Sequence, residues 1–322
     1  WIFDTVCNYT THSEACSSSS IKNNNVSSSN NNNNDYDNDN NNKDDKNNNN
    51  KLSFFTIISD TTTGPGTTRC GGVLVHEDII LSAAGCVKLG DIVRIGYSTD
   101  DQSIAIRNPV DIRNHPMAFV NDEFVFEENL PHDISVIKLS KPIDTSIIAP
   151  IIIKRNYVSD NNNNLEFQYA HAGTSEDCQK KFTMGTFSSS SSSSISGNTN
   201  NDEEPHFYHS VQTGRVQIMN FNTCKQKYMD LPGYHATTLD EDLQFCIQHS
   251  TNSPCDGYAW GSPLWYHDND DSFLVGLASQ GQCGSDGMPF VYTRISDNHY
   301  DFITETICEL SSNPPQSCLL TE

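Results

Sequence analysis

Between residues 54 and 295 the sequence is a succession of short apolar runs, and this feature constrains the fold more than any other. Each run is rich in β-branched residues and is bounded by Gly, Pro, Asn or Asp. Such runs are typical of strands joined by turns, and they do not alternate with the helical segments that a parallel sheet requires. We therefore predict an all-β barrel or sandwich rather than an α/β fold.

The predicted strands fall into two sets. The first set comprises Phe54–Ile58, Gly72–Val75, Ile79–Leu81, Ile92–Tyr97, Ile104–Ile106, Ile134–Leu139 and Ile147–Ile153. The second set comprises Leu165–Tyr169, Val211–Phe221, Leu243–Ile247, Pro263–Tyr266, Phe273–Ala278 and Phe290–Ile295. Only the end of the chain is predicted to be helical, because Tyr300, Ile303 and Ile307 recur at helical spacing. Asp297 or Asn298 is the expected N-cap of this helix.

Low-complexity tracts flank and interrupt this β-rich region. Residues 1 to about 50 are rich in Asn, Ser and Asp, and we expect disorder because they carry too little apolar surface to offset chain entropy. A small loop closed by Cys7 and Cys16 is the exception that we expect within them. The insertions Asn161–Asn164 and Ser188–Ser194 are expected to be surface loops. Cation binding by the acidic tail stays an open alternative to simple solvation.

Charge and cysteine content limit the classes of function. The 322 residues carry a net charge of −22, which argues against nucleic acids and anionic membranes as partners. Eleven cysteines without zinc-type spacing indicate disulfides and a secretory or extracellular setting. No apolar run is long enough to span a membrane. The chain begins at Trp1 without a leader, so we expect a processed product or a fragment.

Six motifs follow one another in the β-rich region. They are Cys70–Leu74 with Cys86, Arg113–Pro116, His132–Leu139, Cys255–Leu264, Leu274–Gly281 and Pro289–Ile295. In this order and spacing they resemble the trypsin-like (chymotrypsin-fold, peptidase S1) serine proteases. The resemblance implies two six-stranded antiparallel Greek-key β-barrels, at about 51–150 and 151–297. A C-terminal helix at about 298–310 and a tail at 311–322 complete the expected organisation.

Catalysis in this family requires a serine nucleophile, a histidine that accepts its proton and a buried aspartate that orients the histidine. By resemblance, Gly85 occupies the histidine position and Asp133 the aspartate position. A carboxylate that is buried without partners is costly. We therefore predict that Ser279 and backbone amides near Gly85 donate hydrogen bonds to Asp133, which gives it a structural role.

The position of the nucleophile falls in a loop with one extra residue. Counting forward from the preceding cysteine assigns Ala259 to it, and counting back from the following proline assigns Trp260. Neither has a nucleophilic atom, and Ser262 is the only hydroxyl nearby, three residues past the expected place. His76 and His132 are conceivable substitute bases, but we expect His76 in a hairpin turn and His132 to point oppositely to its neighbour. Surface positions are expected for both.

The substrate pocket and the oxyanion hole also depart from the family pattern. Gly257 matches an oxyanion-hole position, but the new N-terminus and the aspartate that shape this hole in active members have no counterpart here. Ser253 matches the base of the pocket, and Gln280 replaces the tryptophan at its entrance. Phe290 replaces a glycine in the wall, so we expect its ring to fill the slot. We expect no cofactor and no metal.

The family frame also implies pairings for the cysteines. Matching the family bridges pairs Cys70 with Cys86, Cys224 with Cys246 and Cys255 with Cys283, whereas proximity in sequence suggests Cys7 with Cys16 and Cys308 with Cys318. This arrangement leaves Cys178 free. Each bridge should stabilise the fold by about 2–4 kcal/mol.

These observations favour a secreted, catalytically inactive protease homologue that binds or regulates a protein partner. Two alternatives stay open. The first is an active serine endopeptidase with an unorthodox site. The second is an acidic surface or matrix glycoprotein, for which the sequons at Asn8 and Asn25 provide attachment points.

Overall fold

The structure is a computed structural model of the chain. It describes residues 52–60, 67–97, 103–118, 131–155, 166–172, 211–230, 239–248, 259–269, 271–280 and 289–320. The chain divides into two compact units, Trp1–Asn50 and Lys51–Glu322, and all described residues belong to the second. Within the described part, no helix combines the length and the apolar character that a membrane crossing needs.

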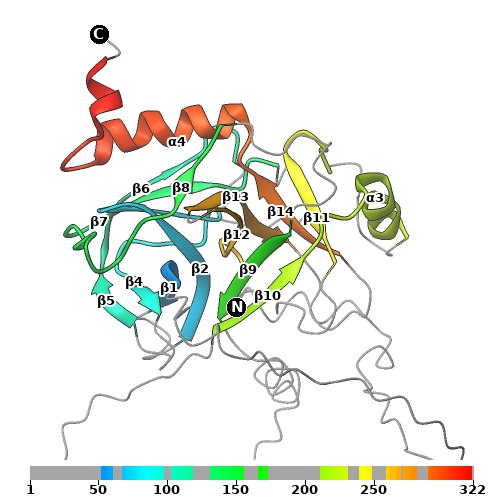
Figure 1. Ribbon diagram of the computed structural model, residues 1–322, viewed down its shortest axis with the longest axis horizontal. Coiled ribbons are helices and arrows are strands. Elements are labelled where there is room, and N and C mark those ends of the chain that lie inside the picture. Colours follow the sequence, from blue (N-terminus) through cyan, green and yellow to red (C-terminus); the bar gives the residue numbers. More distant parts are fainter. Residues whose placement is uncertain are drawn as a thin grey trace, which may run out of the picture. The chain divides into compact units, whose positions relative to one another are not determined.

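The first sheet contains seven antiparallel strands in the order β5-β4-β1-β2-β3-β7-β6 (Figure 1). They are β1 (Leu52–Asp60), β2 (Thr67–His76), β3 (Ile79–Ser82), β4 (Ile92–Tyr97), β5 (Ser103–Arg107), β6 (Pro109–Asn114) and β7 (Ser135–Leu139). Every residue of β3 is buried, and so are seven consecutive residues of β1. Burial of both faces explains why these strands are continuous apolar runs instead of alternating ones.

The run Ile147–Ile153 was predicted as a strand of the first set, but only Ile152–Ile153 is a strand, and it pairs with Phe273 and Leu274 of the second sheet. The first sheet nevertheless has seven strands, where the family resemblance implied six, because of a bend at Asn108. This bend divides a continuous stretch into β5, which pairs with β4, and β6, which pairs with β7. Pro109 at the bend has no backbone N–H to donate to a ladder. The sequence predicted β5 but not β6, because β6 is mostly exposed or half-buried and carries few apolar residues.

The second sheet has the order β10-β9-β12-β13-β14-β11, and β8 adds a short parallel pair to β13. Its strands are β8 (Ile152–Ile153), β9 (Phe167–Ala172), β10 (Val211–Val216), β11 (Gln244–Ile247), β12 (Pro263–Asp268), β13 (Asp271–Gln280) and β14 (Phe290–Arg294). Both sheets are antiparallel apart from the β8 pair, and both curl (Figure 1). The fold is therefore the predicted all-β fold of two curled antiparallel sheets.

One hydrophobic core connects the two sheets and the C-terminal helix. It includes Trp265 and Leu277 of the second sheet and Ile303 and Ile307 of the helix, in addition to most of the apolar residues of the first sheet. Phe54 meets Trp265 edge to face with ring centroids 5.2 Å apart. A second core lies within the second sheet. This shared packing fixes the segments of both sheets that carry the candidate site.

Within the described residues, two α-helices and one 3₁₀ helix accompany the sheets. Helix α4 (Asp297–Leu310) agrees with the prediction, but its N-cap is Ser296, whose side chain accepts a hydrogen bond from the His299 backbone N–H. Helix α3 (Phe221–Met229) was not predicted, because the run Val211–Phe221 was expected to be one strand. That strand ends at Val216, and Asn220 caps the helix by accepting from the N–H of Thr223. A 3₁₀ helix, η3 (Gln316–Leu320), follows α4.

Three of the expected disulfides are present. Cys70–Cys86 closes the turn after β3, Cys224–Cys246 attaches α3 to β11, and Cys308–Cys318 holds η3 to the end of α4. The expected Cys7–Cys16 and Cys255–Cys283 bridges lie outside the described residues, as does Cys178. Two bridges in the described part thus tie the β3 turn and helix α3 to the sheets, and the third joins η3 to α4.

Candidate functional site

The turn after β3 carries the position that the family resemblance assigns to histidine. β3 ends at Ser82, and Gly85 adopts a left-handed conformation with φ 78°. A side chain with a Cβ is strained in this conformation, whereas glycine is not. The backbone at Gly85 therefore has a shape that suits glycine and disfavours an imidazole.

Asp133 lies just before β7 and is 7% exposed. Its Oδ1 accepts a hydrogen bond from the Ala84 backbone N–H at 2.6 Å, and its Oδ2 accepts one from the Ser279 hydroxyl at 2.6 Å. These are the two kinds of partner that the sequence predicted for it. Burial raises the pKa of Asp133 to about 7, although both hydrogen bonds act to lower it.

The segment 259–262 lies against the turn after β3. The Gly71 N–H donates to the Trp260 carbonyl at 2.7 Å, and the Gly261 N–H donates to the Ala278 carbonyl at 2.6 Å. Gly261 has φ 77°, and a Cβ added there would lie 2.2 Å from Ser82 Oγ. Only glycine allows this close approach. The segment that carries the nucleophile position therefore approaches the end of β3 at Ser82 and Ala83, shortly before the histidine position at Gly85.

Ala259 and Trp260, the two candidates for the nucleophile position, have different environments. Ala259 is fully buried in the core of the second sheet. Trp260 is partly buried and packs against both main cores, so it lies at the junction between the two sheets. Its indole Nε1 is buried and has no hydrogen-bond partner within the described part.

Ser262 does not present its hydroxyl to a substrate. The residue is 1% exposed, and a Cβ placed on Gly71 would lie 2.1 Å from Ser262 Oγ. The hydroxyl therefore points at the backbone of β2. It is buried without a hydrogen-bond partner among the described residues, so no described imidazole is bonded to it.

The two histidines weighed as substitute bases have other roles. His76 ends β2 and is bonded through Nδ1 to the Asp78 carboxylate at 3.0 Å. The expectation of a surface position for His132 was wrong, because its ring is 7% exposed and packs with two other histidines. His132 and Asp133 contact different partners, in agreement with the expectation that consecutive side chains diverge.

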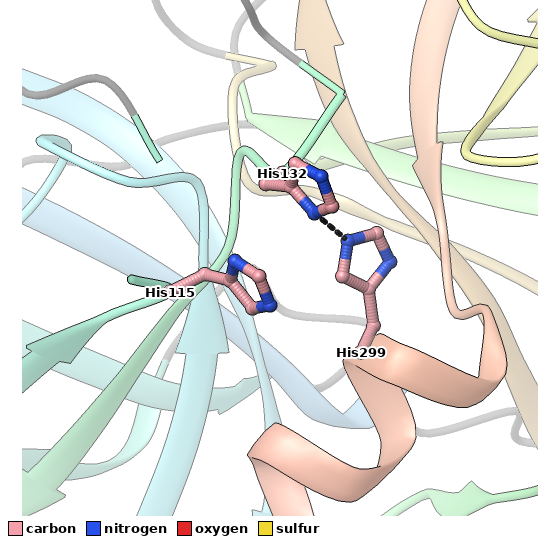
Figure 2. Close-up of side chains that lie close together, drawn as sticks. All are labelled: His115, His132 and His299. Carbon is pink, nitrogen blue, oxygen red and sulfur yellow. Dashed lines mark hydrogen bonds between the residues drawn. The ribbon is translucent and has the colours of Figure 1, made fainter. Parts of the chain in front are cut away.

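The partners of His132 are His115 and His299, which the sequence analysis did not select (Figure 2). His115 directly follows β6, and His299 lies in the first turn of α4. No spacing signal links three histidines from such distant segments. The only hint was that His115 and His132 belong to two of the six motifs.

The described pocket residues are buried. Phe290, on β14, is 2% exposed and packs in the core of the second sheet, with its ring 5.7 Å from that of Tyr292. Gln280 at the end of β13 is 9% exposed. Ser253 and Gly257 lie outside the described residues. The structure thus places the Phe290 ring in the core of the second sheet, and its filling of the substrate slot stays a prediction.

The β-rich region matches one known family. The family model described as Trypsin matches residues 43–303, which is more than half of the chain. The chain belongs to the trypsin family. Neuropsin, a serine protease expressed in the limbic system of mouse brain, has a TM-score of 0.52 at 22% identity, covering 79% of this chain and 94% of that one. At this identity the likeness supports the trypsin-like fold alone.

Curated relatives of this trypsin-family chain include venom serine protease Bi-VSP of Bombus ignitus, 26% identical over 248 residues that cover 73% of this chain and 58% of the relative. Phenoloxidase-activating factor 3 of Holotrichia diomphalia is 23% identical, covering 76% and 66%. Snake venom serine protease Dav-X of Deinagkistrodon acutus is 24% identical, covering 76% and 78%. The match thus spans less than two thirds of the length of the first two relatives.

Proposed function

We propose that this chain is a secreted, non-catalytic member of the trypsin family that acts as a protein-binding or regulatory module. The observation that carries the proposal is the environment of Asp133. Its carboxylate is held by Ala84 N–H and Ser279 Oγ at 2.6 Å each, and the neighbouring Gly85 has no side chain to be oriented. Asp133 is therefore a buried structural acid.

The nucleophile position supports the same proposal. Neither Ala259 nor Trp260 has an atom that could attack a carbonyl carbon, and an acyl-enzyme cannot form without a nucleophile. Ser262 keeps its hydroxyl against Gly71, away from solvent. Losing one triad member in a protease of this kind costs on the order of 10⁴- to 10⁶-fold in rate, and two positions differ here.

Secretion is part of the proposal. It is supported by three disulfides in the described residues and by relatives that are named as venom proteases. A protein partner is the proposed ligand, because the trypsin-like fold provides a stable surface, and the buried ring of Phe290, which the resemblance assigns to the wall of the substrate pocket, supports this choice over a peptide substrate.

A fluorophosphonate probe tests the proposal directly. The full chain should remain unlabelled under conditions that label trypsin stoichiometrically, and it should not turn over peptide substrates. Stoichiometric labelling of any serine would contradict the proposal and favour the active endopeptidase. The variant Ser262→Ala then identifies the reactive group, because labelling that disappears in this variant assigns it to Ser262.

The matrix alternative requires a different experiment. Affinity capture from the native fluid should recover the same partner with the full chain and with a chain lacking residues 1–50. Loss of the partner on removing residues 1–50 would contradict binding through the trypsin-like domain.

A further inference from the structure

His115, His132 and His299 form a cluster of three buried imidazoles beneath the C-terminal helix (Figure 2). They are 4%, 7% and 0% exposed. One ring nitrogen from each lies within 4.8 Å of one from each of the others. In a tetrahedral site with Zn–N bonds of about 2.0–2.1 Å, two ligand nitrogens lie about 3.4 Å apart. The three nitrogens are thus already gathered to nearly the spacing of a metal site.

The backbone brings His115 and His132 together. The His115 N–H donates to the Ile134 carbonyl at 2.9 Å, which extends the pairing of β6 with β7 by one residue beyond Asn114. The Ile134 N–H turns back to the His132 carbonyl at 2.8 Å. The two imidazoles stack with centroids 4.6 Å apart and planes 5° apart. The site therefore belongs to the rigid end of two paired strands.

His299 is oriented toward the other two rings by a backbone carbonyl. Its Nδ1 donates to the Arg294 carbonyl at 2.5 Å, so the lone pair of the neutral ring is on Nε2. That Nε2 lies 2.9 Å from His132 Nδ1 (Figure 2). A backbone carbonyl that holds the far nitrogen of an imidazole is the usual support of a metal ligand, because it fixes both tautomer and direction.

We propose that His115, His132 and His299 bind one Zn²⁺ ion and thereby fasten α4 to the β6–β7 end of the first sheet. Imidazole nitrogen suits Zn²⁺, whereas Ca²⁺ and Mg²⁺ prefer oxygen ligands. All three side chains offer a nitrogen lone pair when they are neutral. The ion would take the place of the proton that lies between His132 Nδ1 and His299 Nε2, and this proton would move to Nε2 of His132 so that the ring stays neutral. This proposal departs from the sequence-based expectation of no metal, and it is independent of whether the chain is catalytic.

Ion binding requires small movements of two rings. Lone pairs lie in the planes of the imidazoles, so the parallel rings of His115 and His132 cannot both point at one ion until one of them tilts. His115 Nδ1 accepts from the Met117 N–H at 3.2 Å. Coordination through Nε2 places a proton on Nδ1 and breaks this contact. The amide of Met117, on the exposed side of the site, should therefore report binding by a change of its NMR shift.

Calorimetric titration of the full chain with ZnCl₂, after removal of metals by a chelator, tests the proposal. Excess Ca²⁺ is added so that it occupies the acidic tail if the tail binds cations. Under these conditions we expect one Zn²⁺ per chain and a melting temperature higher than that of the zinc-free chain. Since losing only an outer-shell partner of a metal ligand costs about 10- to 100-fold in affinity, His115→Gln and His132→Gln should each lose more than about 100-fold. His267→Gln, which removes an exposed histidine on β12, is the matched control and should bind as the wild type does.

A second measurement needs no variant and so does not depend on whether the buried substitutions fold. Co²⁺ bound to the wild-type chain should give the strong visible bands of a four-coordinate site with three imidazoles and one water, without thiolate charge transfer, and Zn²⁺ should displace it. The proposal is overturned if the wild type binds no Zn²⁺, if Zn²⁺ affinity is unchanged in His115→Gln and His132→Gln, or if bound Co²⁺ is octahedral.

Discussion

Two neighbouring regions of this protein contain consecutive residues of the chain, His132 and Asp133, but one region is built around bases and the other around an acid. Asp133 belongs to the region that we propose is a remnant of a catalytic site, where a buried carboxylate is held by Ala84 N–H and Ser279 Oγ; this region is called the remnant below. His132 belongs to the histidine cluster with His115 and His299. The remnant holds an acid without an imidazole to orient, and the cluster holds three imidazoles. The alternation of a strand-like backbone is enough to direct the two side chains to separate regions.

Burial shifts the titration of the two regions in opposite directions. It raises the pKa of Asp133 to about 7 and lowers those of His115 and His299 to about 4. The pKa of His132 is also lowered by burial. In each region the neutral form is therefore the one that folding favours. A low-dielectric setting thus keeps a group neutral whether that group is an acid or a base. The contributions of the two regions to stability should therefore depend on pH with opposite sign.

The largest expected effect is the removal of His299 from the cluster. His299→Ala leaves a cavity under α4 and deprives the Arg294 carbonyl and His132 Nδ1 of their partner. We expect the metal-free protein to lose about 2–4 kcal/mol of unfolding free energy, measured by urea denaturation with a chelator present. His267→Ala, at an exposed position, should change it by less than about 0.5 kcal/mol. If His299→Ala also changed the unfolding free energy by less than about 0.5 kcal/mol, the histidine cluster would not contribute to the packing under α4.

The next effect is the dependence of stability on Asp133. Its folded-state pKa lies above the value of about 3.9 for an unfolded aspartate, so its contribution is full below that pH and is lost as the pH rises through about 7. As the pH rises from 5 to 8, the unfolding free energy of Asp133→Asn should therefore rise relative to that of the wild type, by on the order of 2 kcal/mol. Urea denaturation across this range measures the difference. Asp271→Asn removes an exposed carboxylate and should give a flat difference.

The histidines act on the opposite side of the same profile. Their folded-state pKa values lie below the unfolded value of about 6.5, so their contribution is present above that pH and is lost as the pH falls toward about 4. The Asp133→Asn protein should keep this acid loss. If the unfolding free energy of Asp133→Asn no longer fell between about pH 6.5 and pH 4, the fall seen in the wild type would not come from the histidine cluster.

The sequence predicted the remnant far better than the cluster, and the reason is physical. Gly85, Asp133 and Ser279 each lie within a local motif, and the cost of burying an unpaired carboxylate is enough to predict its hydrogen bonds. His299 is brought to His132 by the packing of α4 on the first sheet, which no local pattern encodes. Helix α3 was missed because Val211–Phe221 has a continuous β-like run, although Asn220 is an ordinary N-cap.

The smallest effect concerns the backbone of the remnant at Gly85. Gly85→Ala places a Cβ at φ 78° and should cost about 1–2 kcal/mol in unfolding free energy. Gly85→Asn should cost less, because asparagine tolerates the left-handed region, and it is the matched control. Gly85→His should cost at least as much as Gly85→Ala and should leave the protein unlabelled by a fluorophosphonate. A stable, labelled Gly85→His protein would mean that the site lost only one side chain, and it would contradict the proposal that the chain is non-catalytic, to which the positive φ of Gly85 and the buried hydroxyl of Ser262 lend support.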